Sequence, residues 1–373
     1  MSSWDRQEKR LTVKYIDEFR KPDNVQKVLA LIQSRSARPV QIMEFCGGHT
    51  HAIFKLGLRQ LLPSTVRLLS GPGCPVCVTS TADIDMAIAM TSIPGRIMTT
   101  FGDMIRVPGS TWSLETARAQ GADVRIVYST LDALAIAHAN PDRQIIFLGI
   151  GFETTAPTVA AAVIKAKAEG VRNFSVLCLH KLTPPAMKAI LDAGEVTLSG
   201  IIGPGHVTTI IGTDAWRFLP REHGMPCAVA GFEPLDIVHA IYALVDMIER
   251  VAPDVSNSYM RSVRSEGNRV AQHMMDQVFR VGPAMWRGLG TVPDSGLSLR
   301  DEFAAYDAVA RFPVQVESSQ EPKGCRCGEV VRGITQPPDC PLFARVCTPE
   351  HPVGACMVSS EGTCAAYAQY GEV

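Results

Sequence analysis

Short apolar runs that end in glycine-rich turns recur from about residue 38 to residue 231, and each is followed by a stretch with the composition of a helix. Strands and helices that alternate at this spacing predict an α/β fold, with largely parallel sheets covered by helices. Ligands of such folds bind beyond the carboxyl ends of the strands or between lobes. The predicted strands are 40–45, 66–69, 96–100, 124–128, 144–150, 174–179, 200–202 and 228–230.

Three segments are expected along the 373 residues, which are enough for two ordinary cores. A break at 139–142 separates a first α/β lobe, residues 1–138, from a second lobe, residues 139–317, in which long helices are predicted over 235–251 and 257–281. The third segment, residues 318–373, is rich in Pro and Gly and poor in aliphatic side chains. Such a segment cannot build much of an apolar core, so a metal centre would have to supply much of its order.

The charge balance and the hydropathy of the chain exclude several classes of partner. Lys and Arg number 36 against 37 Asp and Glu, so the net charge of -1 gives no overall attraction to nucleic acid or to an anionic membrane. No run of about 18 apolar residues occurs, and residues 1–10 are too polar for a secretory signal. A cytoplasmic location is therefore expected, where eleven cysteines indicate metal binding or redox chemistry more than structural disulfides.

The third segment holds six of the eleven cysteines: Cys325, Cys327, Cys340, Cys347, Cys356 and Cys364. This set lacks the paired C-x2-C spacings that structural zinc sites use. Thiolates from separate loops suit an iron-sulfur cluster, because each iron takes one soft ligand and the cluster is large enough to reach distant points. A cluster with four ligands would leave two of the six thiols for redox exchange beside it.

Two glycine-rich loops of the first lobe carry further candidate thiols. Cys46 follows a predicted strand and opens a helix in CGGHTH at 46–51, so backbone N–H groups and the helix dipole are expected to favour its thiolate. His49 and His51 are two residues apart, so at most one of them is expected to point into the site. Cys74 and Cys77, in GPGCPVC at 71–77, predict a redox dithiol or, together with Cys46, an open three-thiolate iron site.

Two other strand ends are candidate walls of the site. Glu153, in GFETT at 151–155, is expected either to present a carboxylate to a polar ligand or to cap the following helix. This run lacks the third glycine of a dinucleotide-binding loop, which disfavours dinucleotide binding. His206, in GPGHV at 203–207, is either a metal ligand or proton donor, or a histidine with structural hydrogen bonds. Residues 231–234 predict a structural turn into a helix.

Taken together, these motifs resemble one family. CGGHTH, GPGCPVC, GFETT and GPGHV, with the cysteine pattern from residue 324 to residue 370, are similar to those of the HypD family of hydrogenase maturation proteins, and the likeness covers nearly the whole chain. Thr208 departs from the serine that the family usually has, but the hydroxyl group is kept. The resemblance implies two α/β lobes and a third domain with a [4Fe-4S] cluster. It also implies that the cluster ligands are Cys327, Cys340, Cys347 and Cys364, with Cys325 and Cys356 as a redox disulfide pair beside them.

The resemblance implies a function as well. The chain is expected to be the scaffold on which the Fe(CN)2(CO) unit of [NiFe]-hydrogenase is assembled, together with the small chaperone HypC and with HypE, a cyanide donor that follows HypF. Cys46 would bind the iron, jointly with a cysteine of the small partner. His49 would place a proton or a hydrogen bond near the cyanide nitrogen, and Glu153 would help the same pocket. Cys74 and Cys77 would exchange thiols or bind iron transiently, and the cluster would relay electrons to the site through the Cys325 and Cys356 pair. The sequence does not decide whether such a scaffold turns over as an enzyme.

Two other functions stay open. An iron-sulfur-dependent disulfide reductase would use Cys74, Cys77 and the cysteine-rich segment, but it gives no role to Cys46 and its histidines. A purely structural metal protein leaves all the glycine-rich loops unexplained. The sequence contains no phosphate loop, no C-x3-C-x2-C radical cluster motif and no G-x-S-x-G elbow, which disfavours nucleotide hydrolysis, radical chemistry and serine hydrolysis.

Overall fold

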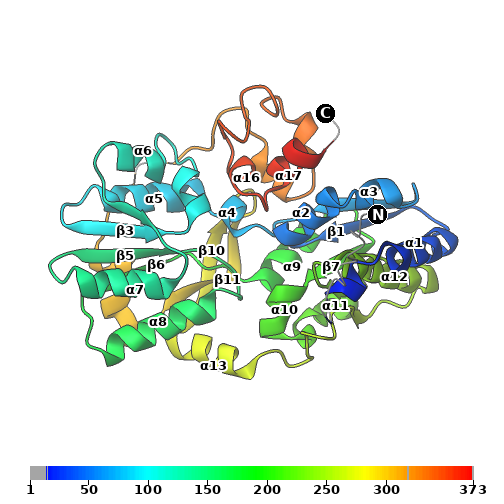
Figure 1. Cartoon of the computed structure of the whole chain (residues 1–373), viewed down its shortest axis with the longest axis horizontal. Helices are drawn as coiled ribbons and strands as arrows, with labels where there is room; N and C mark the ends of the chain where they lie inside the picture. The colour runs from blue at the N-terminus through cyan, green and yellow to red at the C-terminus, as the bar shows by residue number, and fades with distance from the viewer. Residues whose placement is uncertain (1–13, 15, 317–318, 372–373) are drawn as a thin grey trace, which may run out of the picture.

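The computed structural model describes residue 14, residues 16–316 and residues 319–371. Two parallel sheets covered by helices form two lobes, with a two-stranded hairpin between them and the cysteine-rich tail above their junction (Figure 1). The predicted α/β class with largely parallel sheets is therefore confirmed. Within the described residues, no helix has both the length and the apolar character needed to cross a membrane.

The first sheet has five parallel strands in the order β2-β1-β7-β8-β9. These strands are β1 (Val40–Glu44), β2 (Val66–Ser70), β7 (Gly200–Pro204), β8 (Cys227–Ala230) and β9 (Val255–Asn257). The four strands β2, β1, β7 and β8 are almost wholly buried and rich in aliphatic side chains, as expected of a parallel sheet covered on both faces. α1 (Pro22–Arg35) and α12 (Pro234–Arg250) pack together against this sheet.

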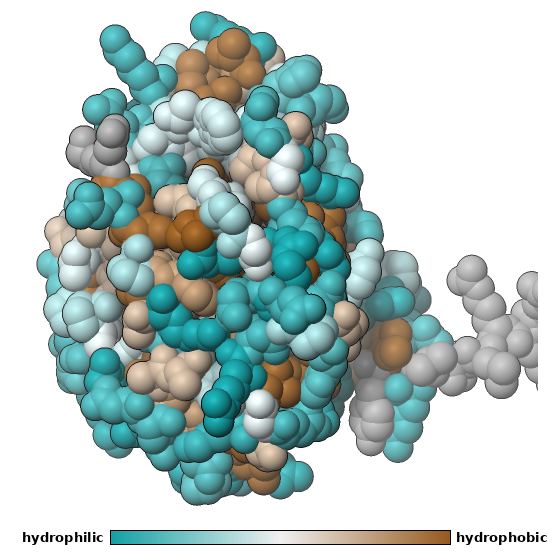
Figure 2. Space-filling model, turned by 90° about the vertical axis from the view of Figure 1, so that its left-hand side faces the viewer, coloured by the Kyte–Doolittle hydropathy of each residue, from teal (hydrophilic) through white to brown (hydrophobic). Residues whose placement is uncertain are grey.

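The second sheet has four parallel strands in the order β4-β3-β5-β6. They are β3 (Arg96–Thr100), β4 (Val124–Ile126), β5 (Gln144–Gly149) and β6 (Phe174–Cys178). α5 (Thr81–Thr91), α6 (Leu114–Ala119), α7 (Thr130–Ala139), α8 (Ala156–Ala168) and α14 (Ala308–Arg311) surround it. The outer face of this lobe is mostly hydrophilic, with hydrophobic side chains in small separate groups (Figure 2).

The chain builds the first sheet in two parts, one before and one after the second sheet. It leaves the first sheet after β2, forms all four strands of the second, and returns to the first at β7. The segment boundary expected between residues 138 and 139 therefore lies inside the second sheet, between β4 and β5. The reason is that β7 pairs with β1, although all four strands of the second sheet lie between them in the sequence. The order of the elements along the chain does not reveal this pairing.

All eight predicted strands are present, and α12 confirms the helix predicted over 235–251. The helix predicted over 257–281 is wrong over most of its length, because α13 covers only Arg269–Val278 and β10 begins at Phe279. Gly267 turns the chain before α13 with a φ of 69°, where a side chain would lie 2.3 Å from the carbonyl oxygen of Ile210. Asn268 then caps α13 by accepting the N–H of Ala271.

The hairpin of β10 (Phe279–Trp286) and β11 (Gly290–Leu299) was not predicted from the sequence. It connects the lobes through two isolated β-bridges. One joins Trp286 to Thr79, shortly before α5, and the other joins Gly296 to Lys181, shortly after β6. Trp286 is fully buried, and its indole N–H donates to Ser295 Oγ at 2.8 Å. The hairpin thus fixes the spacing between the carboxyl ends of the two sheets.

The tail consists of short helices and loops that dock on the first lobe. Its helices are α15 (Cys327–Val331), η5 (Pro337–Asp339), α16 (Ala355–Val358) and α17 (Thr363–Tyr370). α17 packs on α2 (Gly47–Lys55), where the rings of Tyr367 and Phe54 lie 4.4 Å apart and Arg59 donates to the Tyr367 hydroxyl at 2.7 Å. The tail also shares an apolar core with the second lobe through Val330, Val331 and Met357.

The remaining elements are short, apart from α9. They are α3 (Leu58–Leu61), α4 (Pro75–Val78), α9 (Thr183–Ala193), α10 (Gly205–Ile211) and α11 (Phe218–His223), with 3-10 turns η1 (Asp17–Phe19), η2 (Gly102–Arg106), η3 (Thr213–Trp216) and η4 (Asp301–Tyr306). Several of these helices begin directly after a strand, so the loop that joins the strand to the helix has little conformational freedom.

Candidate functional site

The strand order of the first sheet brings four glycine-rich loops together. β1 lies between β2 and β7, and β8 is the next strand along. The carboxyl ends of parallel strands meet at one edge, so Cys46 after β1, Cys74 after β2, His206 after β7 and Phe232 after β8 share that edge. The sheet, more than any single motif, creates the site.

Close backbone contact joins the two thiol loops. The N–H of Gly47 donates to the carbonyl of Gly73 at 2.9 Å, and a side chain on Gly73 would lie 2.2 Å from the nitrogen of Cys46. Only glycine therefore fits at position 73. On the other side, Cys46 Sγ lies 3.6 Å from Nδ1 of His206, which confirms that the GPGHV loop faces this thiol.

The expectation that Cys46 would be a thiolate is wrong for the chain by itself. Burial raises the pKa of Cys46 well above its ordinary value, and the carboxylates of Glu361 and Glu44 raise it further. The N–H groups of His49 and Gly48 lower the pKa as expected, but burial outweighs them. A cation bound to the sulfur would reverse this balance.

Glu44, which no sequence motif singled out, supports the Cys46 loop through hydrogen bonds. Its carboxylate accepts the Cys46 N–H at 3.0 Å and the hydroxyl of Thr50. Burial raises the pKa of Glu44 to about 7, and these hydrogen bonds act in the opposite direction. The only signal in the sequence is a charged residue at the end of an otherwise apolar strand.

His49 lies at the site, and His51 turns away toward Tyr370. Nε2 of His49 faces the carbonyl oxygens of Ala230 at 3.2 Å and Gly231 at 2.9 Å, so it must carry the hydrogen. Burial lowers the pKa of His49 to about 4. The ring is therefore neutral, and its buried Nδ1 presents a lone pair with no partner among the described residues. In this tautomer His49 cannot donate to a cyanide nitrogen.

Phe232 forms an apolar wall beside both histidines. Its ring centroid lies 5.1 Å from that of His49 and 5.4 Å from that of His206, and 37% of the residue is exposed. The turn at 231–234 leads into α12 as predicted, but it also contributes to the site. Burial lowers the pKa of His206 to about 4, so this ring is neutral as well.

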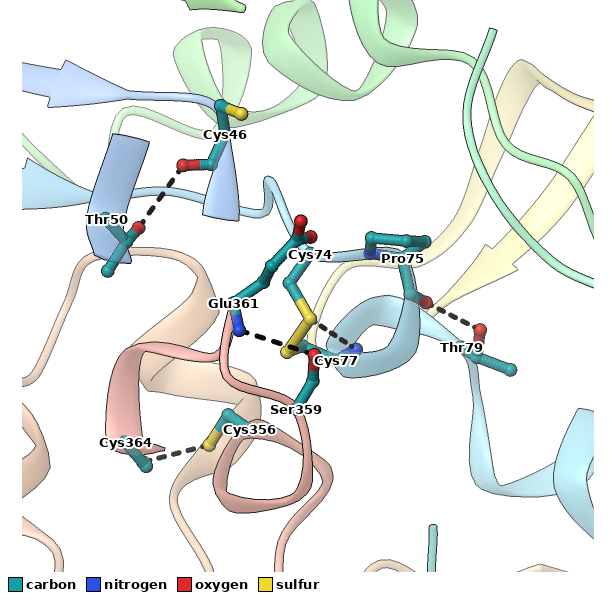
Figure 3. The surroundings of a disulfide bond; sticks show 10 residues. All are labelled: Cys46, Thr50, Cys74, Pro75, Cys77, Thr79, Cys356, Ser359, Glu361 and Cys364. Carbon is teal, nitrogen blue, oxygen red and sulfur yellow. Dashed lines mark hydrogen bonds between the residues drawn. A yellow bond between two sulfur atoms is a disulfide. The ribbon is translucent and has the colours of Figure 1, made fainter. Parts of the chain in front are cut away.

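Cys74 and Cys77 are joined by a disulfide, with a Cα–Cα distance of 5.2 Å. Cys74 caps α4, since its sulfur accepts the N–H of Cys77 at 3.2 Å. The three-thiolate arrangement with Cys46 is therefore not formed in this structure. Figure 3 shows Glu361 of the tail between Cys46 and the disulfide. Burial raises the pKa of Glu361, and no pattern in the sequence pointed to this residue.

Glu153 lies at the carboxyl end of the second sheet and caps a helix. Its carboxylate accepts the backbone N–H of Thr183 at 2.7 Å and the Thr183 hydroxyl at 3.1 Å, at the start of α9. Burial raises the pKa of Glu153 to about 7. These hydrogen bonds give Glu153 a structural role, but at α9 and not at the following helix α8, whose N-cap residue Thr155 makes no side-chain cap.

The tail cysteines lie close enough for their sulfur atoms to influence one another's pKa values. Cys356 Sγ lies 2.9 Å from Cys364 Sγ, and Cys356 also shares a hydrogen bond with Cys327. Burial raises the pKa of Cys325 to about 12, and the charges of Cys327, Cys340 and Cys347 add to this effect. All six are free thiols here, including the expected disulfide partners Cys325 and Cys356. Their oxidation to a disulfide stays a prediction.

Metal binding by these cysteines stays a prediction. Within residues 14, 16–316 and 319–371, no group of three or more His, Cys, Asp or Glu side chains is arranged to hold one metal ion. A [4Fe-4S] cluster does not need such convergence, because each thiolate binds a different iron. Several buried thiols with raised pKa values also need a cationic partner before they can ionise together.

Comparisons with known proteins agree with these features. The sequence model of the HypD family, described as Hydrogenase formation hypA family, matches residues 23–371. The Hydrogenase maturation factor HypD of Cupriavidus necator is 48% identical over 370 residues, which cover 96% of this chain and 97% of the relative. Those of Azotobacter vinelandii and Escherichia coli are 47% and 44% identical over 96% of this chain, and cover 97% and 98% of each relative. The chain therefore belongs to the HypD family of hydrogenase maturation factors.

Proposed function

We propose that the chain is the scaffold on which the Fe(CN)2(CO) unit of [NiFe]-hydrogenase is assembled, in complex with HypC and HypE. The observation that carries this proposal is the meeting of Cys46, His206 and the Cys74–Cys77 disulfide at one edge of the first sheet. Iron that carries cyanide and carbon monoxide is soft and takes a thiolate readily. The burial of Cys46 and the apolar ring of Phe232 beside His206 would also shield such a substrate from water and oxidants.

Cys46 is the proposed iron ligand. Its thiol is neutral before iron arrives, so the S–H proton must leave as the Fe–S bond forms. Nδ1 of His206, at 3.6 Å from the sulfur, is placed to take this proton, and the half-buried ring can pass it to solvent. The N–H groups of Gly48 and His49 then stabilise the sulfur charge.

His49 is proposed to orient the pocket, since it does not donate to cyanide in its neutral form. Its Nε2–H holds the β8 carbonyls, and its ring supports Phe232. The lone pair on Nδ1 leaves His49 able to accept a hydrogen bond from a protonated ligand or from water. Glu153 is proposed to act indirectly, through α9, which packs in the core of the first sheet.

Cys74 and Cys77 are proposed to cycle between disulfide and dithiol, which takes up two electrons and two protons. A [4Fe-4S] cluster held by Cys327, Cys340, Cys347 and Cys364 would supply single electrons when bound. Cys325 and Cys356 are proposed as the reversible pair between them. Replacing Cys325 by Ala should then leave the brown colour of the cluster but impair maturation, and unchanged hydrogenase activity would remove the pair from the mechanism.

The Cys74–Cys77 disulfide also favours a second candidate, an iron-sulfur-dependent disulfide reductase. Both cysteines are buried, however, which hinders attack on a bulky disulfide substrate. A reductase would oxidise and reduce this pair with every turnover on an added disulfide. A scaffold would not show this turnover with an added disulfide.

The decisive experiment is an infrared spectrum of the protein purified without air from hydrogenase-producing cells, with its partners bound. CN and CO stretching bands are expected in the wild type and in Cys178→Ala, a half-buried thiol on the second sheet. Loss of the bands in Cys46→Ala supports the scaffold. A brown protein that never shows these bands, with or without Cys46, contradicts it and favours the reductase.

A further inference from the structure

Phe232 follows β8 at the edge of the first sheet where the candidate site lies. Its ring centroid lies 5.1 Å from that of His49 and 5.4 Å from that of His206. Most aromatic rings stabilise a fold by burial among other apolar groups. This ring is 37% exposed and is not part of any buried apolar cluster of the described residues, so its position calls for another reason.

The ring lies on the solvent side of the Cys46 thiol. A side chain on Gly48 would lie 2.7 Å from Cε1 of Phe232 and 3.5 Å from Cys46 Sγ, so the ring and the sulfur border the same small space. Cys46 and His49 are buried, whereas His206 is half-buried and Phe232 is the most exposed of the four. Exposure thus falls from the ring to the thiol, as expected if the ring covers the sulfur.

The backbone that carries the ring is held on both sides. Before the ring, the carbonyl of Gly231 accepts the Nε2–H of His49 at 2.9 Å. After it, the N–H of Glu233 donates to Asp236 at 3.2 Å, and the Glu233 carboxylate accepts two hydrogen bonds from Arg20 at 2.6 and 2.7 Å. The ring itself has no hydrogen-bonding group, so it can rotate about its side-chain bonds without breaking this framework.

A thiolate beside an imidazole is not selective for iron by itself. Such donors bind Zn²⁺ more tightly than Fe²⁺, so a protein must obtain its selectivity from access and geometry. A hydrated cation that approaches Cys46 would lose water against the apolar face of Phe232 and gain no hydrogen bond from it. An iron unit that carries cyanide and carbon monoxide has already exchanged part of its water, so it loses less on entry.

We propose that Phe232 is a specificity-determining residue of the site, whose ring covers the Cys46 sulfur and excludes hydrated cations and bulky reagents from it. The inference rests on the proposed function for the identity of the iron unit that is admitted. The ring turns aside for a compact, weakly hydrated ligand and otherwise closes over the thiol.

The test uses the full chain, purified without air, and two maleimides with the same reactive group, N-methylmaleimide and the larger N-phenylmaleimide. Quenching and mass spectrometry give the rate constant of each reagent at Cys46, separately from the other cysteines. The ratio of the two rate constants reports access, because the thiolate fraction of Cys46 cancels in it. Phe232→Ala should lower the ratio of the methyl to the phenyl rate constant about tenfold. Phe232→Leu should fall in between, and Phe232→Tyr, which keeps the ring, should match the wild type.

Tyr128→Ala is the matched control, since it removes a ring that is 92% exposed and follows β4 of the second sheet. Its ratio should equal that of the wild type. A second measurement adds Zn²⁺ and follows the protection of Cys46 from N-methylmaleimide. Half-protection should need about tenfold less Zn²⁺ in Phe232→Ala than in the wild type.

Neither measurement requires bound iron, so the two proposals fail in different ways. An unchanged ratio in Phe232→Ala overturns the role of Phe232 even if both rates rise, because a merely loosened site accelerates both reagents alike. Equal protection by Zn²⁺ overturns the exclusion of hydrated cations. If Phe232→Ala does not fold, the ratio in Phe232→Leu decides. A lowered ratio in a protein that never shows the infrared bands contradicts the scaffold and supports Phe232 as the cover of the thiol.

Discussion

The sulfur of Cys46 lies 3.6 Å from Nδ1 of His206, although the two residues are 160 positions apart in the sequence. Each follows a strand of the first sheet, and those strands, β1 and β7, are neighbours. Neither motif alone would give a site for a soft metal. The pairing of β1 with β7 across the whole second sheet produces the contact, and the two neutral rings near the thiol follow from it.

Replacing His206 by Ala should reduce maturation about tenfold or more, because the thiol would lose the group placed to receive its proton. Hydrogenase activity in cells that carry the variant measures this, with protein levels checked by immunoblot. His51→Ala is the matched control, since His51 lies in the same loop but packs on Tyr370. Equal activity of the two variants would contradict the role of His206.

The buried carboxyl of Glu153 should make stability depend on pH. Its pKa in the folded protein, about 7, lies above the ordinary 4.5, so the folded state binds the proton more tightly. The resulting stabilisation is complete below about pH 4.5 and is lost as the pH rises through 7. Glu153→Gln does not titrate but keeps an oxygen for Thr183. Between about pH 5 and about pH 8 the wild type should lose roughly 3 kcal/mol relative to this variant.

Urea unfolding of the wild type and Glu153→Gln at several pH values measures that difference directly. Other groups that titrate are common to both proteins and cancel. A difference that stays constant with pH would show that Glu153 is ionised in the folded protein over the whole range. The carboxylate would then be a plausible partner for a polar ligand after all.

Local signals were sufficient for the first eight strands and for the thiol loops, but not for β9, β10 and β11. An apolar run followed by glycine can be recognised within a few residues, so the positions of Cys46, Cys74 and Cys77 at strand ends were predicted correctly. The prediction that Cys46 would ionise readily was wrong because it used local features alone. Backbone N–H groups are a local feature, whereas the burial that outweighs them depends on the tail and on neighbouring strands.

The rest of the site depends on contacts that no local pattern contains. Glu361 reaches Cys46 only because α17 packs on α2, and Phe232 reaches His49 because β8 lies two strands from β1. The β10–β11 hairpin carries Gly282 and Pro283, which weaken the usual strand pattern.

The contact between Gly47 and the tail offers a test of docking. A side chain at position 47 would lie 2.5 Å from Cβ of Glu361 and 2.6 Å from its carbonyl oxygen. Gly47→Ala should therefore displace the Glu361 loop and destabilise the protein by about 1–3 kcal/mol. Gly282→Ala is the control, because no atom lies within 4 Å of its added side chain. Thermal unfolding of both variants measures the effect, and equal midpoints would contradict this packing.

Thiol counting should separate the two disulfides that have been considered for this chain. Nine of the eleven cysteines are free in the structure, so chelated, denatured protein handled without air should alkylate at nine positions before reduction and at eleven afterwards. Mass spectrometry should find Cys74 and Cys77 as the two protected residues. Two further protected positions at Cys325 and Cys356 would establish the second pair in the isolated protein. Free Cys74 and Cys77 before reduction would instead contradict the disulfide and return the three-thiolate site with Cys46 as the better description of these loops.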